Sequence, residues 1–150
     1  MTDEERYTFS SLMTLLIETE TKLKQLYETI AEGTGLPKLR SLLFDYCKSS
    51  LKRTEMMRTS RVERVVEMAL EPITGLKLME LVEKISTTIE DGRVSNIEKA
   101  RTIEKTISEL YARASPTIMQ ISAETSELLM ALSRESMERF RELEQYVGLT

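Results

Sequence analysis

No histidine and no tryptophan occur among the 150 residues of this chain, and cysteine occurs once. Without histidine the chain lacks the commonest metal ligand and the commonest general base in proteins. The single cysteine, Cys47, cannot form an internal disulfide, which favours a reducing compartment. With no histidine or second cysteine to act beside it, we interpret Cys47 as a small buried residue.

Long apolar runs and blocks of like charge are also missing. No stretch approaches the ~20 apolar residues needed to cross a bilayer, and the charged start of the sequence, residues 1–6, is unlike a signal peptide. The net charge is −4, with 25 acidic and 21 basic residues mixed along the chain, which does not favour nucleic-acid binding. We therefore expect a cytoplasmic protein whose partner is neither a membrane nor a nucleic acid.

Glycine and proline are scarce, with five and three residues, and they fall at a few points of the chain. The segments between them are rich in good helix formers, and no alternating β-branched run indicates a strand. These breaks, with capping pairs such as Thr2–Glu5 and Ser95–Glu98, predict five helices in a single domain of residues 1–150. The expected helices cover residues 3–32, 37–71, 75–90, 96–114 and 115–147.

The boundary at Ser115-Pro116 fits either a corner between two helices or a kink in one long helix, and we favour the corner. Short connections make neighbouring helices antiparallel, so the helices are expected to alternate in direction. The predicted fold class is all-α, an up-down bundle of four main helices in which the short third helix is a crossover between two hairpins.

Two of the predicted helices carry an apolar seam with a glutamate in its middle. The seam of the first helix comprises Phe9, Met13, Leu16, Glu20, Leu23, Tyr27 and Ile30, and that of the fourth comprises Ile97, Ala100, Glu104, Ile107, Tyr111 and Ala114. A carboxylate on such a seam is costly unless it is paired, protonated or metal-bound. One interpretation puts both glutamates at the seam edge, reaching water or a basic neighbour. The other is a functional pair of carboxylates.

The spacing Glu20-x6-Tyr27 recurs as Glu104-x6-Tyr111. A Glu-x6-Tyr motif on two helices of a two-hairpin bundle resembles the ferritin and rubrerythrin family. This resemblance implies a ferritin-like fold in which the other two helices each supply a Glu-x-x-His motif and the bundle holds two irons. Because the chain has no histidine, neither of those motifs can be complete, so no metal or cofactor is expected. If a metal binds, Glu20 and Glu104 are its candidate ligands.

Arg53 lies about where the family spacing places a metal ligand on the second helix, and Met56 follows three residues later. A thioether is a poor ligand for iron, and an arginine repels a metal ion. We hypothesise that the charge of Arg53 substitutes for the metal charge and bridges Glu20 and Glu104. The candidate central polar cluster consists of Glu20, Tyr27, Arg53, Glu104 and Tyr111.

The second helix also carries the densest basic stretch, in which Arg58, Arg61 and Arg64 form a weak candidate anion site. A solvated face interleaved with glutamates is the alternative interpretation. The stretch is similar to an Arg-rich helix of cobalamin adenosyltransferases, which are trimeric helical bundles that bind ATP at subunit interfaces. That resemblance implies a nucleotide or cobalamin ligand, but the Gly/Thr-rich phosphate loop of the family has no counterpart in this sequence.

No complete catalytic constellation, zinc pattern or hydrolase elbow is present. We therefore assign no catalytic residues and do not expect an enzyme. The favoured interpretation is a non-catalytic scaffold that self-associates into a homo-oligomer. The alternatives are a carboxylate-only metal or redox bundle that uses Glu20 and Glu104, and a nucleotide- or cobalamin-binding relative of the adenosyltransferases.

Overall fold

A computed structural model describes residues 5–63 and 71–149 of the chain, and the regular structure within them is helical apart from one pair of very short strands. The α-helices are α1 (Phe9–Gly33), α2 (Pro37–Glu63), α3 (Met79–Glu90), α4 (Asn96–Ile118) and α5 (Ala123–Leu143), and a 3₁₀ turn (Glu144–Tyr146) follows α5. Strands β1 (Arg6–Tyr7) and β2 (Ile73–Thr74) pair in antiparallel fashion. The predicted all-α class is confirmed, and the expectation of no strand is wrong only for this pair.

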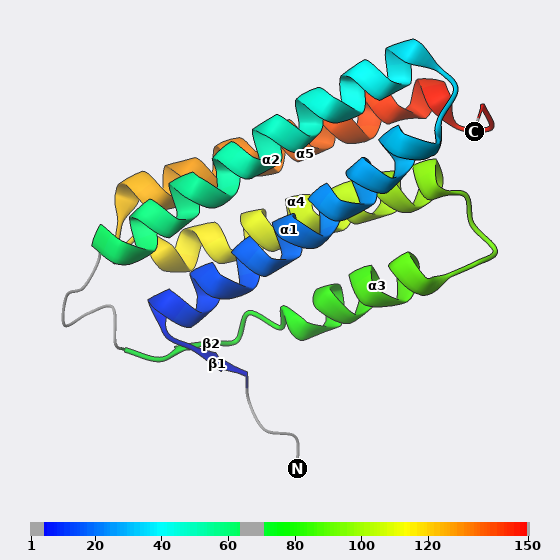
Figure 1. Cartoon of the computed structure of the whole chain (residues 1–150). Coiled ribbons are helices and arrows are strands. Elements are labelled where there is room, and N and C mark those ends of the chain that lie inside the picture. The colour runs from blue at the N-terminus through cyan, green and yellow to red at the C-terminus, as the bar shows by residue number, and fades with distance from the viewer. Residues whose placement is uncertain (1–4, 64–70, 150) are drawn as a thin grey trace.

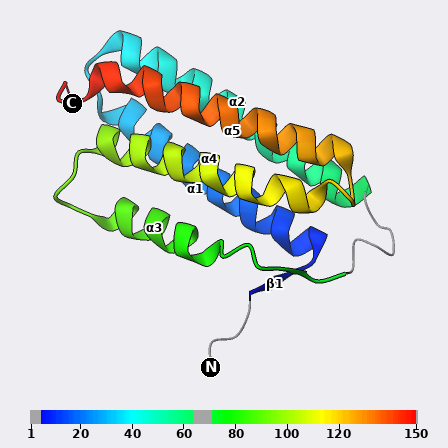
Figure 2. The same cartoon turned by 180° about the vertical axis from the view of Figure 1, so that it is seen from behind.

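The helices form two antiparallel hairpins, α1 with α2 and α4 with α5 (Figure 1). Helix α1 packs on α4, and α2 contacts α5, so the hairpins face each other. Helix α3 lies along α4 on the side away from α5, which is clearest from behind (Figure 2). It carries the chain back along the molecule between the two hairpins. None of the described helices is both long and apolar enough to cross a membrane.

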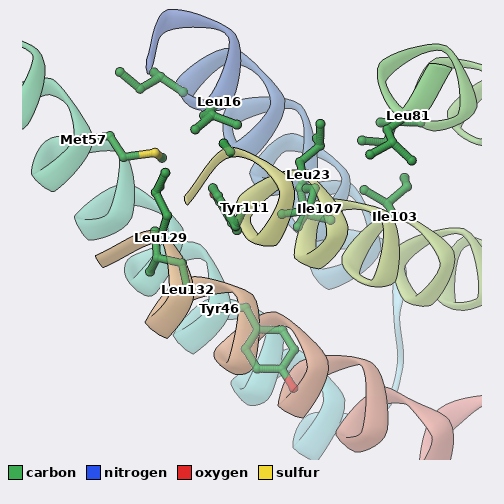
Figure 3. Close-up of a cluster of buried hydrophobic side chains, with 14 of the residues drawn as sticks. Leu16, Leu23, Tyr46, Met57, Leu81, Ile103, Ile107, Tyr111, Leu129 and Leu132 are labelled. Atoms are coloured by element: carbon green, nitrogen blue, oxygen red, sulfur yellow. The ribbon is translucent and has the colours of Figure 1, made fainter. Parts of the chain in front are cut away.

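The core lies between the hairpins, and every residue of the two predicted seams is buried in it. Leu16 and Leu23 of α1 face Ile107 and Tyr111 of α4, while Leu129 of α5 lies beside them (Figure 3). Because buried apolar side chains contribute ~1.5–3 kcal/mol each relative to exposure, this cluster fixes which face of each helix points inward.

Two pairs of serines hold α4 against α5. Ser108 and Ser133 exchange hydroxyl-to-carbonyl hydrogen bonds of 2.8 and 2.9 Å, and Ser115 and Ser126 do the same at 2.8 Å. The pairs lie seven residues apart on each helix, so they recur on the same face after two turns. Small side chains at these positions let the two backbones approach closely.

The first helix begins later than the sequence predicts, because its cap is a different residue. Thr8 caps α1 by accepting from the Ser11 amide at 3.0 Å, and the Thr8 amide donates to the Ser11 hydroxyl at 2.8 Å. The predicted start at residue 3 and the cap Thr2 lie outside the described residues. Glu5, the predicted partner of Thr2, interacts instead with the start of α3. Its carboxylate accepts hydrogen bonds from the Leu78 and Met79 amides, at 3.0 and 3.1 Å, at the start of α3.

The predicted extents of the second and third helices are also corrected. Helix α2 ends at Glu63, and the expected continuation through residues 64–70 lies outside the described residues. Helix α3 begins at Met79 and not at Gly75, because Gly75 (φ +80°) and Lys77 (φ +53°) adopt left-handed backbone conformations that a right-handed helix does not contain.

The corner between the last two long helices exists, but Pro116 does not form it. Helix α4 continues through Pro116 to Ile118, and α5 begins at Ala123 with Ser122 as its cap. Ile118 is fully buried and Ser115 is bonded to α5, so packing stabilises one further turn despite the amide that proline lacks. The predicted boundary is therefore too early, because α4 ends four residues later than predicted and α5 begins eight residues later.

Candidate functional site

Glu20 and Arg53 form the first half of a buried polar centre between the hairpins. Glu20 has no exposed surface, and Arg53 is 2% exposed. One guanidinium nitrogen of Arg53 (Nη1) donates to Glu20 Oε1 at 2.6 Å and to the Ser136 hydroxyl of α5 at 3.1 Å. The Tyr111 hydroxyl of α4 donates to the same Glu20 oxygen at 3.2 Å. Four helices thus contribute one side chain each.

Glu104 and Arg139 form the second half of the centre in the same way. Glu104 is fully buried on α4, and Arg139 Nη1 on α5 donates to Glu104 Oε1 at 3.3 Å. The same nitrogen donates to the Ser50 hydroxyl of α2 at 3.1 Å. Tyr27 of α1 interacts with the Glu104 carboxyl group, which raises the pKa of the tyrosine and lowers that of the glutamate, but its hydroxyl makes no hydrogen bond of good geometry with a described residue.

The arginines and serines belong to a second repeated motif that the sequence contains but that we did not predict. Ser50-x2-Arg53 on α2 recurs as Ser136-x2-Arg139 on α5. In each motif the arginine binds the glutamate of its own hairpin, and the serine binds the arginine of the other hairpin. The Glu-x6-Tyr and Ser-x2-Arg repeats together give the centre an approximate two-fold symmetry.

The hypothesis for Arg53 is thereby partly corrected. Arg53 pairs with Glu20 as expected, but Glu104 takes its hydrogen bond from Arg139 instead. Met56, the expected neighbour of Arg53 in the motif, is 41% exposed, and the buried residue three positions away is Ser50. Ser50 precedes Arg53, so the repeated Ser-x2-Arg spacing is the signal that identifies it.

Glu135 connects the two halves at the surface side of the centre. Its Oε1 lies 3.0 Å from Arg53 Nη2 and 3.6 Å from Arg139 Nη2, and it accepts a hydrogen bond of 2.8 Å from the Ser49 hydroxyl. The Glu135 side chain is 43% exposed. Burial alone would raise the pKa of its carboxyl, but the nearby Arg53 charge and the Ser49 hydrogen bond lower the pKa below its ordinary value.

The electrostatic environment distinguishes the buried groups. Burial raises the pKa of Glu104 from 4.5 to about 7, and the charges of Arg139 and Arg53 only partly oppose this rise. Burial also works against the charge of Arg53, but Glu20 and Glu104 raise its pKa above the ordinary value. Burial and the charge of Glu20 raise the pKa of Tyr111 well above 10. Both arginines therefore stay charged, whereas Glu104 titrates near neutrality.

Aromatic rings enclose the centre on the Arg139 side. The guanidinium carbon of Arg139 lies 4.9 Å from the Tyr46 ring centroid, a cation–π distance. The Tyr27 and Tyr46 rings lie 5.2 Å apart in a tilted arrangement, and the Tyr46 hydroxyl donates to Glu142 at 2.9 Å near the surface. This packing restricts the position of Arg139.

The donor set of the centre does not fit a metal ion. The two buried carboxylates each direct one oxygen at an arginine, and a cation placed between them would meet two guanidinium charges. Among residues 5–63 and 71–149, no group of three or more cysteine, aspartate or glutamate side chains is arranged to hold a metal. The chemistry available here is charge pairing and proton uptake by Glu104.

The weaker candidate site does not come together in the described residues. Arg58 is exposed on α2, whereas Arg61 donates to the Thr14 hydroxyl of α1 at 2.9 Å. Arg64 lies outside the described residues. Cys47 is buried, as expected, and burial raises the pKa of its thiol, which makes it a weak nucleophile.

Comparison of the chain with known protein families, curated proteins and solved structures finds no match.

Proposed function

We propose that this protein is a non-catalytic, self-associating scaffold with a ferritin-like bundle, in which two arginines provide the positive charge that metal ions provide in the ferritin family. One observation carries the proposal. Each of the two fully buried glutamates, Glu20 and Glu104, has an arginine nitrogen within 3.3 Å. Buried carboxylates need such compensation, and here the protein itself supplies it.

The spacing of the second motif supports the ferritin-like part of the proposal. Ser50-x2-Arg53 and Ser136-x2-Arg139 have the separation of the family's Glu-x-x-His motif, with serine in place of glutamate and arginine in place of histidine. Positions three residues apart lie on one face of a helix, so both members of each motif can reach the centre. The hairpin order, with α3 as the crossover, agrees with the same family.

The charge balance supports a structural role for the centre. The two arginines offset the two buried glutamates, and Glu135 adds a partly solvated carboxylate between them. Breaking a buried ion pair by removing one partner costs ~3–5 kcal/mol, whereas replacing the whole pair by apolar residues is often neutral. A centre of this kind favours one packing of the hairpins over others that would separate the charges.

A metal-binding experiment tests the proposal. Tag-free protein is incubated with ferrous iron and manganese, desalted and measured by mass spectrometry for metal content. We expect no retained metal in the wild type. About two equivalents, the number that the family motif holds, lost in the Glu20→Ala/Glu104→Ala variant, would replace the scaffold with a carboxylate-only metal bundle.

A variant that restores the family ligands tests the ferritin-like register separately. Ser50→Glu, Arg53→His, Ser136→Glu and Arg139→His together rebuild two Glu-x-x-His motifs opposite Glu20 and Glu104. We expect this variant to retain about two metal equivalents and to melt at a higher temperature with metal than without it.

The matched control removes the same four groups without adding ligands, as Ser50→Ala, Arg53→Met, Ser136→Ala and Arg139→Met. Glu20→Gln and Glu104→Gln are added to this control so that no uncompensated carboxylate stays buried, and we expect it to remain helical by circular dichroism and to bind no metal. A restored variant that is helical but holds no metal would contradict the ferritin-like register, and it would not bear on whether the wild type binds metal.

A further inference from the structure

The outward face of α2 carries a second seam that the hairpin packing does not use. Its six members alternate four and three residues apart, and all are exposed. They are Phe44, Lys48, Leu51, Glu55, Arg58 and Val62, which we call the α2 seam. This alternation is the spacing of a coiled-coil interface, and α2 lies at the edge of the molecule in both overall views (Figures 1 and 2).

The apolar members of the α2 seam are unusually exposed for large side chains. Phe44 is 47% exposed, Leu51 48% and Val62 68%. Phe44 and Leu51 also line an open groove of about 520 Å³ between α1 and α2. Large apolar residues at regular spacing along a groove indicate a surface that another helix covers.

The charges of the α2 seam are arranged so that the seam complements itself. If a second α2 helix packs antiparallel with Leu51 near the two-fold axis, Lys48 of one copy lies opposite Glu55 of the other. In the same register Phe44 lies opposite Arg58, which suits a cation–π contact. A two-fold interface requires this reciprocity, because each contact occurs twice.

These charges have no competing use within the described part of the chain, where Lys48, Glu55 and Arg58 make no ion pair with another described residue. Lys48 and Glu55 are two turns apart, roughly 10 Å along the helix axis. A uniformly acidic or basic partner would meet a like charge at one of these positions, whereas a second copy of the chain meets opposite charges at both.

We propose that two copies of this chain form a symmetric dimer by packing their α2 seams antiparallel around Leu51. The proposal rests on the self-association in the proposed function and names its surface. The buried Arg–Glu centre lies on the opposite face of α2, so dimer formation leaves it intact.

Sedimentation velocity over a range of protein concentrations tests the dimer, and Leu51→Glu is the most disruptive change. It places two like charges together at the axis, and we expect a fold-change in the dissociation constant of at least about a hundred. Met119→Glu is the matched control, since Met119 is 52% exposed near the α4–α5 corner. We expect it to dimerise like the wild type.

A charge exchange identifies the register and excludes a folding effect. Lys48→Glu alone and Glu55→Lys alone each place like charges opposite one another, and we expect each to weaken the dimer about tenfold or more. The double variant Lys48→Glu/Glu55→Lys restores opposite charges across the axis, and we expect it to recover most of the affinity. Recovery in the double variant cannot result from misfolding of the single variants.

The outcomes separate the surface from the proposed function. A wild type that remains monomeric at millimolar concentration would overturn both the dimer and the self-association. If the protein forms an oligomer whose dissociation constant is unchanged by Leu51→Glu and by both charge changes, the α2 seam is not the interface. Self-association would still hold. Single-variant losses without recovery in the double variant would contradict the antiparallel register.

Discussion

Glu20 and Glu104 occupy equivalent places in the two hairpins, but the structure holds the first more tightly than the second. Arg53 approaches Glu20 at 2.6 Å and is also 3.0 Å from Glu135. Arg139 is 3.3 Å from Glu104 and 3.6 Å from Glu135. The pKa of Glu104 is raised to about 7 by burial. The comparison shows that a repeated motif specifies which groups meet, whereas the packing around each pair sets how closely they approach.

The tyrosine hydroxyl beside Glu20 is also held more tightly than the one beside Glu104. Tyr111 donates to Glu20 at 3.2 Å, whereas the Tyr27 hydroxyl makes no hydrogen bond of good geometry with a described residue. Arg139 is instead packed on the Tyr46 ring at 4.9 Å. The first half of the centre is thus held by hydrogen bonds, and the second half by ring packing and a longer ion pair.

The largest expected effect comes from removing either arginine. Arg53→Met leaves Glu20 buried without its closest counter-charge and should reduce the free energy of unfolding by about 4 kcal/mol. Arg139→Met should cost less, about 2 kcal/mol, because Glu104 can take up a proton. Urea denaturation at pH 7.5 measures both values.

Adding Glu20→Gln to Arg53→Met controls this comparison, since it removes the uncompensated charge and should recover most of the lost stability. Arg139→Met should also lose less at pH 5.5 than at pH 7.5. If both arginine variants lost the same free energy of unfolding at both pH values, the two halves of the centre would not differ in how strongly they depend on their arginine.

The next effect is a pH dependence assigned to Glu104. Its pKa is about 7 in the folded protein and 4.5 ordinarily, so between these values the folded state binds more protons than the unfolded state. The resulting stabilisation is fully present below pH 4.5 and is lost as the pH rises through 7, by up to about 3 kcal/mol. Unfolding free energies of the wild type and of Glu104→Gln are compared from pH 5 to 8. Over this range the wild type should lose stability relative to Glu104→Gln as the pH rises. A difference between them that does not vary with pH would refute the assignment.

The smallest effect distinguishes the two tyrosines. Tyr111→Phe removes a hydrogen bond to a buried carboxylate and should cost about 1.5 kcal/mol. Tyr27→Phe removes a hydroxyl that interacts with Glu104 without a hydrogen bond of good geometry, and it should cost less, about 0.5 kcal/mol. Thermal and urea unfolding of the two variants side by side provides the measurement, and a larger loss for Tyr27→Phe would reverse our ranking of the halves.

Helical periodicity predicted the parts of this molecule that depend on which face of a helix a residue occupies. The apolar residues of both seams are buried, and Arg53 pairs with Glu20 as hypothesised. Of the two interpretations of Glu20 and Glu104, their full burial excludes the one that puts them at the seam edge. The helix ends were less predictable, because several neighbouring residues could each cap the same helix. Thr8 and not a residue near position 3 caps α1, and the Glu5 carboxylate caps α3 from 73 residues away.

The sequence by itself determined the helical class, the inward face of α1 and α4, and the cost of a carboxylate on each of those faces unless it is paired, protonated or metal-bound. Only the tertiary structure decided that Arg139 pairs with Glu104, that the serines bind across the hairpins and that Glu135 joins the two arginines. The physical reason is that periodicity specifies a direction around one helix axis. Which charges meet depends on how far each helix is shifted along its neighbour, and this shift is set by the packing of all the buried side chains together.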